Sequence, residues 1–256
     1  MKRGFVSVLW GGVLRDNPDI CSSLKDRFNF DYQGSKNCSM ANRMDKIIRN
    51  IRSCAKQGYK DDLTVYVFGK ENEKNIKELG IKTVLIQEDP YMFHPTKGIY
   101  KHKFFAYQNV MEDFDEVVLL DLDMLLFKEL PRDFWEILNQ RDVFQAALHG
   151  YRDHKINHRE GMANKYIPAG AFVYIRDKPL PDRMVSLNEA GGNKWSCEPT
   201  FARLTDELTD GWKGLQVYWD RFEPQFYTSN RSPYRWDTVK YNKNICFRHG
   251  DKTKKA

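Results

Sequence analysis

The sequence predicts an α/β fold with a mostly parallel central sheet flanked by helices. Short apolar runs rich in β-branched residues alternate along the chain with segments of helical periodicity. This alternation is typical of parallel sheets, in which a helix usually connects successive strands. The 256 residues, 41% of them hydrophobic, can bury one large core. We therefore expect a single domain over residues 1–256.

The first expected strand is the apolar run Phe5–Trp10, which ends at Gly11–Gly12, where the backbone can turn sharply and admit a ligand. Basic residues precede the run, as they do in a signal peptide. However, Arg15 and Asp16 follow without a small-residue cleavage site, so we interpret the segment as a strand. The polar residues 15–38 are expected to form a long loop.

Apolar residues then recur at three- and four-residue spacing, which predicts an amphipathic helix ending near Gly58; they are Met44, Ile47, Ile48 and Ile51. The elements expected after it are a strand at Leu63–Phe68, a helix at Glu71–Leu79, a strand at Ile81–Ile86, a helix from Lys97 or Ile99 to Met111, and a strand at Glu116–Leu120. The second half is expected to add a helix at Leu130–Leu138, strands at Val143–Leu148 and Gly170–Ile175, and a helix at Glu198–Leu208.

Composition and charge narrow the functional classes. Lys and Arg number 41 against 35 Asp and Glu, a net charge of +6 that suits a phosphate-bearing partner without demanding nucleic acid. The five cysteines are irregularly spaced and form no Cys-x-x-Cys, which argues against a zinc knuckle or a disulfide framework. No apolar run is long enough to span a membrane. A reducing compartment fits best, and we expect a cytoplasmic location.

Two carboxylates interrupt the apolar run VVLLDLDMLLF at residues 117–127. If the run were extended throughout, Asp121 and Asp123 would share one face of a strand. Neighbouring carboxylates repel and are costly to desolvate, so a positive partner is expected. Mn²⁺ or Mg²⁺ would supply that charge and keep open positions for substrate phosphates. The alternative is that the two acids cap the next element or pair with Lys128.

The same run resembles the first motif of haloacid-dehalogenase-type phosphatases, in which Asp121 would be the nucleophile, although Met124 and Leu125 replace that family's Gly-Thr. A closer resemblance is to glycosyltransferases of the GT-A fold with an Asp-x-Asp motif, of the glycogenin-like, family 8 type. Four blocks carry it in the family's order: FDEVVLLDLDMLLF, YIPAGAFVYIRDKP, GGNKWSCEPTF and CFRHGDKTKK. In the second block, Pro168 stands where the family has Asn.

This resemblance implies a Rossmann-like GT-A fold with a smaller mixed sheet on the acceptor side. It implies that residues 1–127 bind the nucleotide sugar and residues 128–256 bind the acceptor. The implied activity is of the hexosyltransferase type: a sugar moves from a nucleotide-diphosphate donor, expected to be a UDP-sugar, to a glycan or protein acceptor, with Mn²⁺ or Mg²⁺ as cofactor. A different class, a polyanion-binding module using the basic C-terminal tail, also stays open.

The resemblance also assigns roles to individual residues. The metal ligands would be Asp121, Asp123 and His249. Glu198, with Asp121, would be catalytic, either as general base or as an orienting group, or else Glu198 is only an acid favoured at a helix N-terminus. Lys103 would steady the donor, the alternative being a solvated helix lysine. The full set expected at the donor is Leu9, Trp10, Gly11, Lys103, Asp121, Leu122, Asp123, Ala169, Gly170 and Lys252.

Overall fold

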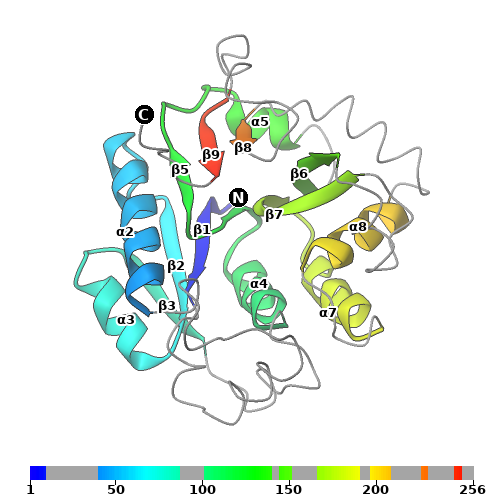
Figure 1. Ribbon diagram of the computed structural model, residues 1–256, viewed down its shortest axis with the longest axis horizontal. Coiled ribbons are helices and arrows are strands. Elements are labelled where there is room, and N and C mark those ends of the chain that lie inside the picture. The colour runs from blue at the N-terminus through cyan, green and yellow to red at the C-terminus, as the bar shows by residue number, and fades with distance from the viewer. Residues whose placement is uncertain are drawn as a thin grey trace.

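A six-stranded mixed sheet runs through the centre of the computed structural model (Figure 1). The structure describes residues 1–9, 40–86, 101–139, 144–151, 166–190, 197–208, 226–229 and 245–249. The strands of the central sheet, in spatial order, are β3 (Lys82–Ile86), β2 (Leu63–Phe68), β1 (Arg3–Leu9), β4 (Glu116–Leu120), β7 (Tyr166–Ile175) and β6 (Phe144–Tyr151). The first four are mutually parallel, and β7 and β6 are antiparallel to their neighbours.

A second, three-stranded sheet has the order β5 (Met124–Leu126), β9 (Phe247–His249) and β8 (Tyr227–Ser229). β5 and β9 are antiparallel, whereas β9 and β8 are parallel. The predicted α/β fold, with a mainly parallel central sheet and a smaller mixed sheet, is therefore confirmed. The helices are α2 (Met40–Lys56), α3 (Lys70–Lys77), α4 (Lys101–Asp113), α5 (Phe134–Asn139), α7 (Leu180–Ala190) and α8 (Cys197–Leu208).

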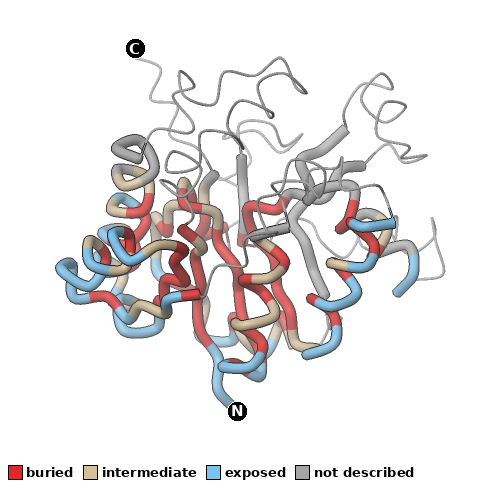
Figure 2. The backbone as a smooth tube through the Cα atoms, turned by 90° about the horizontal axis from the view of Figure 1, so that it is seen from below, coloured by how far each residue is buried: buried red, intermediate tan, exposed pale blue. Residues whose placement is uncertain are grey.

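Helices cover both faces of the central sheet because its strands carry apolar side chains on both sides. One core cluster joins the strands to α4, α7 and α8, and the other joins them to α2, α3, α5 and the small sheet. Successive residues of a strand therefore face different cores: Val117 and Leu119 face the first cluster, and Val118 and Leu120 the second. Figure 1 shows α2 and α3 to the left of β1 and α4, α7 and α8 to its right, and Figure 2 shows buried residues at the centre with exposed residues outside.

Most elements before the Asp-x-Asp run lie where the sequence predicts them. β2 and β4 have the expected bounds, since each is a mainly apolar run that the structure buries completely. α2 extends to Lys56 and is followed by Gly58, whose φ of 84° is a conformation that favours glycine. The expected loop at residues 15–38 and the possible helix starts at Lys97 and Ile99 lie outside the described residues.

The second half departs further from expectation. α5 begins at Phe134 rather than Leu130, because residues 131–133 form a turn in which the Phe134 amide donates to the Pro131 carbonyl at 3.0 Å. β7 begins at Tyr166, four residues earlier than expected, and includes Pro168. Helix α7 and the short strands β5, β8 and β9 were not predicted. Within the described residues, no helix is long and apolar enough to cross a membrane.

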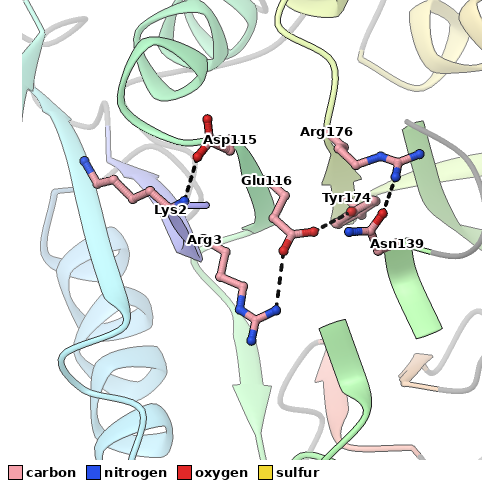
Figure 3. Close-up of polar contacts among 7 residues, drawn as sticks. All are labelled: Lys2, Arg3, Asp115, Glu116, Asn139, Tyr174 and Arg176. Atoms are coloured by element: carbon pink, nitrogen blue, oxygen red, sulfur yellow. Dashed lines mark hydrogen bonds and ion pairs between the residues drawn. The ribbon is translucent and has the colours of Figure 1, made fainter. Parts of the chain in front are cut away.

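A polar network fastens the amino-terminal ends of β1 and β4 (Figure 3). Glu116 is fully buried, and its carboxylate accepts a hydrogen bond from the Tyr174 hydroxyl at 2.8 Å. The Arg3 guanidinium lies 3.6 Å from the other carboxylate oxygen of Glu116. The Lys2 amide donates to Asp115 at 2.7 Å, and that hydrogen bond lowers the pKa of Asp115. This network lies at one end of β4, and Asp121 follows the strand at its other, carboxyl end.

Candidate active site

The two aspartates lie where the strand order of the central sheet reverses. From β1 the chain moves outward through β2 to β3 and then returns to the other side of β1 as β4. In such open α/β sheets, ligands bind outside the carboxyl ends of the strands at this switch point. Ser7 of β1 pairs with Leu120, the last residue of β4, so Leu9 and Asp121 both lie at that edge.

The Asp-x-Asp segment forms a turn, so the condition under which both aspartates would share one face of a strand is not met. β4 ends at Leu120, and the Met124 amide donates to the Asp121 carbonyl at 3.0 Å, which closes a four-residue turn before β5. The apolar side chains of Leu122 and Met124 are buried, while those of Asp121 and Asp123 are 34% and 28% exposed. The turn therefore presents both carboxylates at the surface and anchors the chain between them in the core.

Asp121 is held by a lysine and by a neighbouring strand. The Lys103 ammonium, on the first turn of α4, lies 2.6 Å from Asp121 Oδ1 and donates a second hydrogen bond to the Gly170 carbonyl at 3.0 Å. The Asp121 amide donates to the Ala171 carbonyl at 3.0 Å, so the β4–β7 pairing continues into the turn. The Lys103 side chain is only 16% exposed, which contradicts the alternative of a solvated helix lysine.

Asp123 has a lysine of its own that the sequence reasoning missed. The Lys46 ammonium, from α2, lies 3.6 Å from Asp123 Oδ2, and its side chain is 26% exposed. Each aspartate thus pairs with a lysine from a different helix, and neither lysine is the Lys128 considered for that role. The spacing of polar residues in α2 indicates that Lys46 lies on a face turned toward the rest of the protein. Lys46, Asn50 and Ser53 recur at four- and three-residue spacing. They lie beside the buried apolar residues of the same helix, which are Ile47, Ile51 and Cys54.

The side chains of Leu9 and Leu122 belong to the hydrophobic core, so any contact of these two residues with a ligand would be made by the backbone. Gly170 and Ala169 lie in β7, and the Gly170 carbonyl meets Lys103 directly. β9 brings His249 opposite Met124 in the small sheet, next to Asp123, although the His249 side chain is not among those described.

Several other predicted residues lie wholly or partly outside the described part of the chain. Glu198 lies in the first turn of α8, with its side chain outside the described set. Trp10, Gly11 and Lys252 lie outside the described residues. Among the side chains that the structure does describe, no group of three His, Cys, Asp or Glu residues could hold a metal ion, so a metal site would combine the aspartates with ligands beyond that set.

Comparison with known proteins finds no matching family model and no matching curated protein. Among solved structures, the chain is similar to the apo form of the glycosyltransferase GlyE of Streptococcus pneumoniae, with a TM-score of 0.46, 11% identity, and coverage of 99% of this chain and 55% of that one. It thus spans about half the length of GlyE.

Two further solved structures are similar to this chain. The apo form of mouse xyloside xylosyltransferase 1 has a TM-score of 0.44 and 10% identity, and the alignment covers 98% of each chain. The mannosyltransferase Ktr4p of S. cerevisiae has a TM-score of 0.44 and 10% identity, with coverage of 78% of this chain and 64% of that one. All these similarities are weak in identity and in superposition, and they carry no inference about activity.

Proposed function

We propose that this chain is a metal-dependent glycosyltransferase of the GT-A type that transfers a hexose from a nucleotide-diphosphate sugar to a glycan or protein acceptor. One observation carries the proposal: the Asp121–Asp123 turn lies at the switch point of the central sheet, with each carboxylate facing a lysine from a different helix. A cluster of two acids and two ammonium groups at a ligand-binding edge suits a ligand that brings both positive and negative charge, as a metal-bound diphosphate does.

The carboxylate oxygens of the two aspartates suit a hard divalent cation. Carboxylate oxygens are the ligands that Mn²⁺ and Mg²⁺ prefer, and both aspartates are partly exposed at the turn. We propose Asp121, Asp123 and His249 as the protein ligands, because the β5–β9 pairing sets His249 opposite Met124. Bound there, the dication would neutralise the charge that develops on the departing diphosphate.

The protein groups around the turn would orient the donor. Lys103 holds the Asp121 carboxylate against β7, so this ligand keeps one orientation before the donor binds. The backbone at Leu9 and Leu122 borders the same edge, where we expect the ribose and base. Glu198, at the start of α8, would act on the acceptor side as a base or an orienting group. The choice of UDP follows from the family resemblance.

Two measurements test the proposal. In a thermal-shift panel of nucleotide sugars with Mn²⁺, a UDP-sugar should raise the unfolding temperature, since a ligand that binds only the native state stabilises it by mass action. In the presence of that donor, Asp123→Asn should lower UDP release at least about a hundredfold, because a loss of several kcal/mol of leaving-group stabilisation has that effect on rate.

The matched control is Asp61→Asn, which changes an exposed aspartate in the turn before β2. This variant should release UDP at the wild-type rate. Turnover that needs no metal and survives Asp123→Asn would refute the proposal.

The phosphatase alternative is not favoured. In that family the Asp-x-Asp motif follows the first strand near the N-terminus, whereas here β1, β2 and β3 precede the motif strand β4 in the same sheet. Trapping of a phosphoryl group on Asp121 would revive it. For the polyanion-binding alternative, binding that falls steeply with salt and ignores both Mn²⁺ and Asp123→Asn would be the signature.

A further inference from the structure

Lys46 lies beside the aspartate turn without belonging to the motif. It comes from the second turn of α2, and its ammonium is 3.6 Å from Asp123 Oδ2. That separation is too long for a direct hydrogen bond, so charge alone holds this pair. Lys103, by contrast, makes two hydrogen bonds at 2.6 and 3.0 Å and is more buried. Of the two lysines, Lys46 is therefore the one that can leave its aspartate at low cost.

The helix that carries Lys46 is fixed at this position by buried polar contacts. Asn50, four residues later on the same face, is fully buried and donates to the Ser7 hydroxyl of β1 at 2.9 Å. Ser53, three residues further, accepts a hydrogen bond at 3.1 Å from the Leu126 amide of β5. α2 is thus fastened to β1 and to the strand that follows Asp123.

The Ser53 hydroxyl completes this arrangement, because it also donates to the Asn50 carbonyl at 2.7 Å and so uses both its donor and an acceptor site. Apolar side chains could pack a helix on a sheet without such contacts. Polar contacts add a defined register, since an offset would leave buried donors and acceptors unpaired. The Cα of Lys46 is consequently held beside the turn, while its four-carbon stem lets the ammonium move.

We propose that Lys46 is a phosphate-positioning residue, which Asp123 holds at the site until a dication and the donor diphosphate bind. This inference rests on the proposed function. A dication at Asp123 would take over the carboxylate and repel the ammonium. Because α2 does not move away, the ammonium would stay within reach of the diphosphate, whose negative charge a lysine binds as a mobile point charge.

Lys46→Met, which keeps the aliphatic stem and removes the charge, tests this role by calorimetric titration. Mn²⁺ alone should bind this variant about two- to fivefold more tightly than wild type, which is the worth of a partly exposed ion pair that no longer competes. At saturating Mn²⁺, the affinity of Lys46→Met for UDP should be at least about tenfold lower than that of wild type, because a charge-assisted hydrogen bond to phosphate is lost. Lys46→Arg should keep most of the UDP affinity.

Lys56→Met is the matched control, an exposed lysine on the same helix, and it should change neither affinity. Unfolding midpoints of all variants establish that they are folded. If wild type binds UDP with Mn²⁺ and Lys46→Met binds it equally well, the role of Lys46 is refuted and the proposed function stands. If wild type binds neither Mn²⁺ nor UDP, the proposed function itself fails and this role fails with it.

Discussion

The ion pair between Lys103 and Asp121 predicts that the effect of Asp121→Asn on stability reverses its sign when Lys103 is replaced. Asp121→Asn in wild type should destabilise the protein, because the Lys103 ammonium loses its charged partner at 2.6 Å. In a Lys103→Met background the same substitution should be neutral or stabilising. There the Asp121 carboxylate has lost its cation and is two residues from a second acid, so removing its charge should relieve repulsion.

The magnitude follows from exposure and contact geometry. An exposed ion pair contributes roughly 0.2–1 kcal/mol, and a hydrogen bond to a charged group about 1.5–3 kcal/mol. Lys103 and Asp121 are 16% and 34% exposed, so their coupling should lie between these ranges, at about 1–1.5 kcal/mol. Lys103→Met also loses the hydrogen bond to the Gly170 carbonyl, and its total cost should reach about 2–3 kcal/mol.

Urea unfolding in metal-free buffer, followed by tryptophan fluorescence and circular dichroism, measures the four corners of this double-mutant cycle. The slopes of the transitions must agree for the midpoints to be compared. Lys74→Met, an exposed lysine on α3, is the control for loss of a helix lysine and should cost less than about 0.5 kcal/mol. Additive effects of Lys103→Met and Asp121→Asn would show that the two side chains do not interact, and would refute the reasoning.

Three further outcomes are expected from groups outside the site. Burial raises the pKa of the Cys54 thiol to about 12 and that of Cys246 to about 11, so iodoacetamide at pH 8 should label neither until the protein is unfolded, as peptide mass spectrometry would show. Tyr174→Phe should lower the free energy of unfolding by about 1–3 kcal/mol, measured by urea denaturation, because the buried Glu116 carboxylate loses a donor; no change would mean that Arg3 compensates. The folded state lowers the pKa of Asp115, so this carboxylate stabilises the protein above its unfolded-state pKa of about 4 and loses that effect as pH falls. The stability deficit of Asp115→Asn should therefore be present at neutral pH and shrink in acid, and a deficit that grows in acid would contradict this assignment.

The first half of the fold could be predicted because its signals are local. β2 and β4 are mainly apolar runs with polar borders, and α2 shows a clear helical spacing of Ile47 and Ile51. The alternation of these elements was enough to predict parallel pairing. The position of Asp121 at the carboxyl end of β4 followed from the same pattern.

The parts that escaped prediction depend on contacts between distant segments. No local signal marks Met124–Leu126 as a separate strand, because it is only three residues long and forms through its pairing with β9. The three residues of β9 form a strand only because β5 and β8 pair with them. α7 begins with Leu180 and Pro181, and proline is an ambiguous signal, since it suits a helix start as well as a loop. The pairing of Lys46 with Asp123 joins residues 77 positions apart, which no local pattern records.

The pairing of β5 with β9 has a consequence for biosynthesis. During translation, Asp123 is added to the chain well before His249, which is the last residue of β9, the strand that pairs with β5. Phe247 of that strand also packs against Phe5, Phe134 and Phe172, so the nascent chain keeps part of this aromatic core open until then. Translation intermediates that stop short of β9 should therefore hold the acidic turn without one of the strands that support it, and the turn should reach its final form only after β9 has been added.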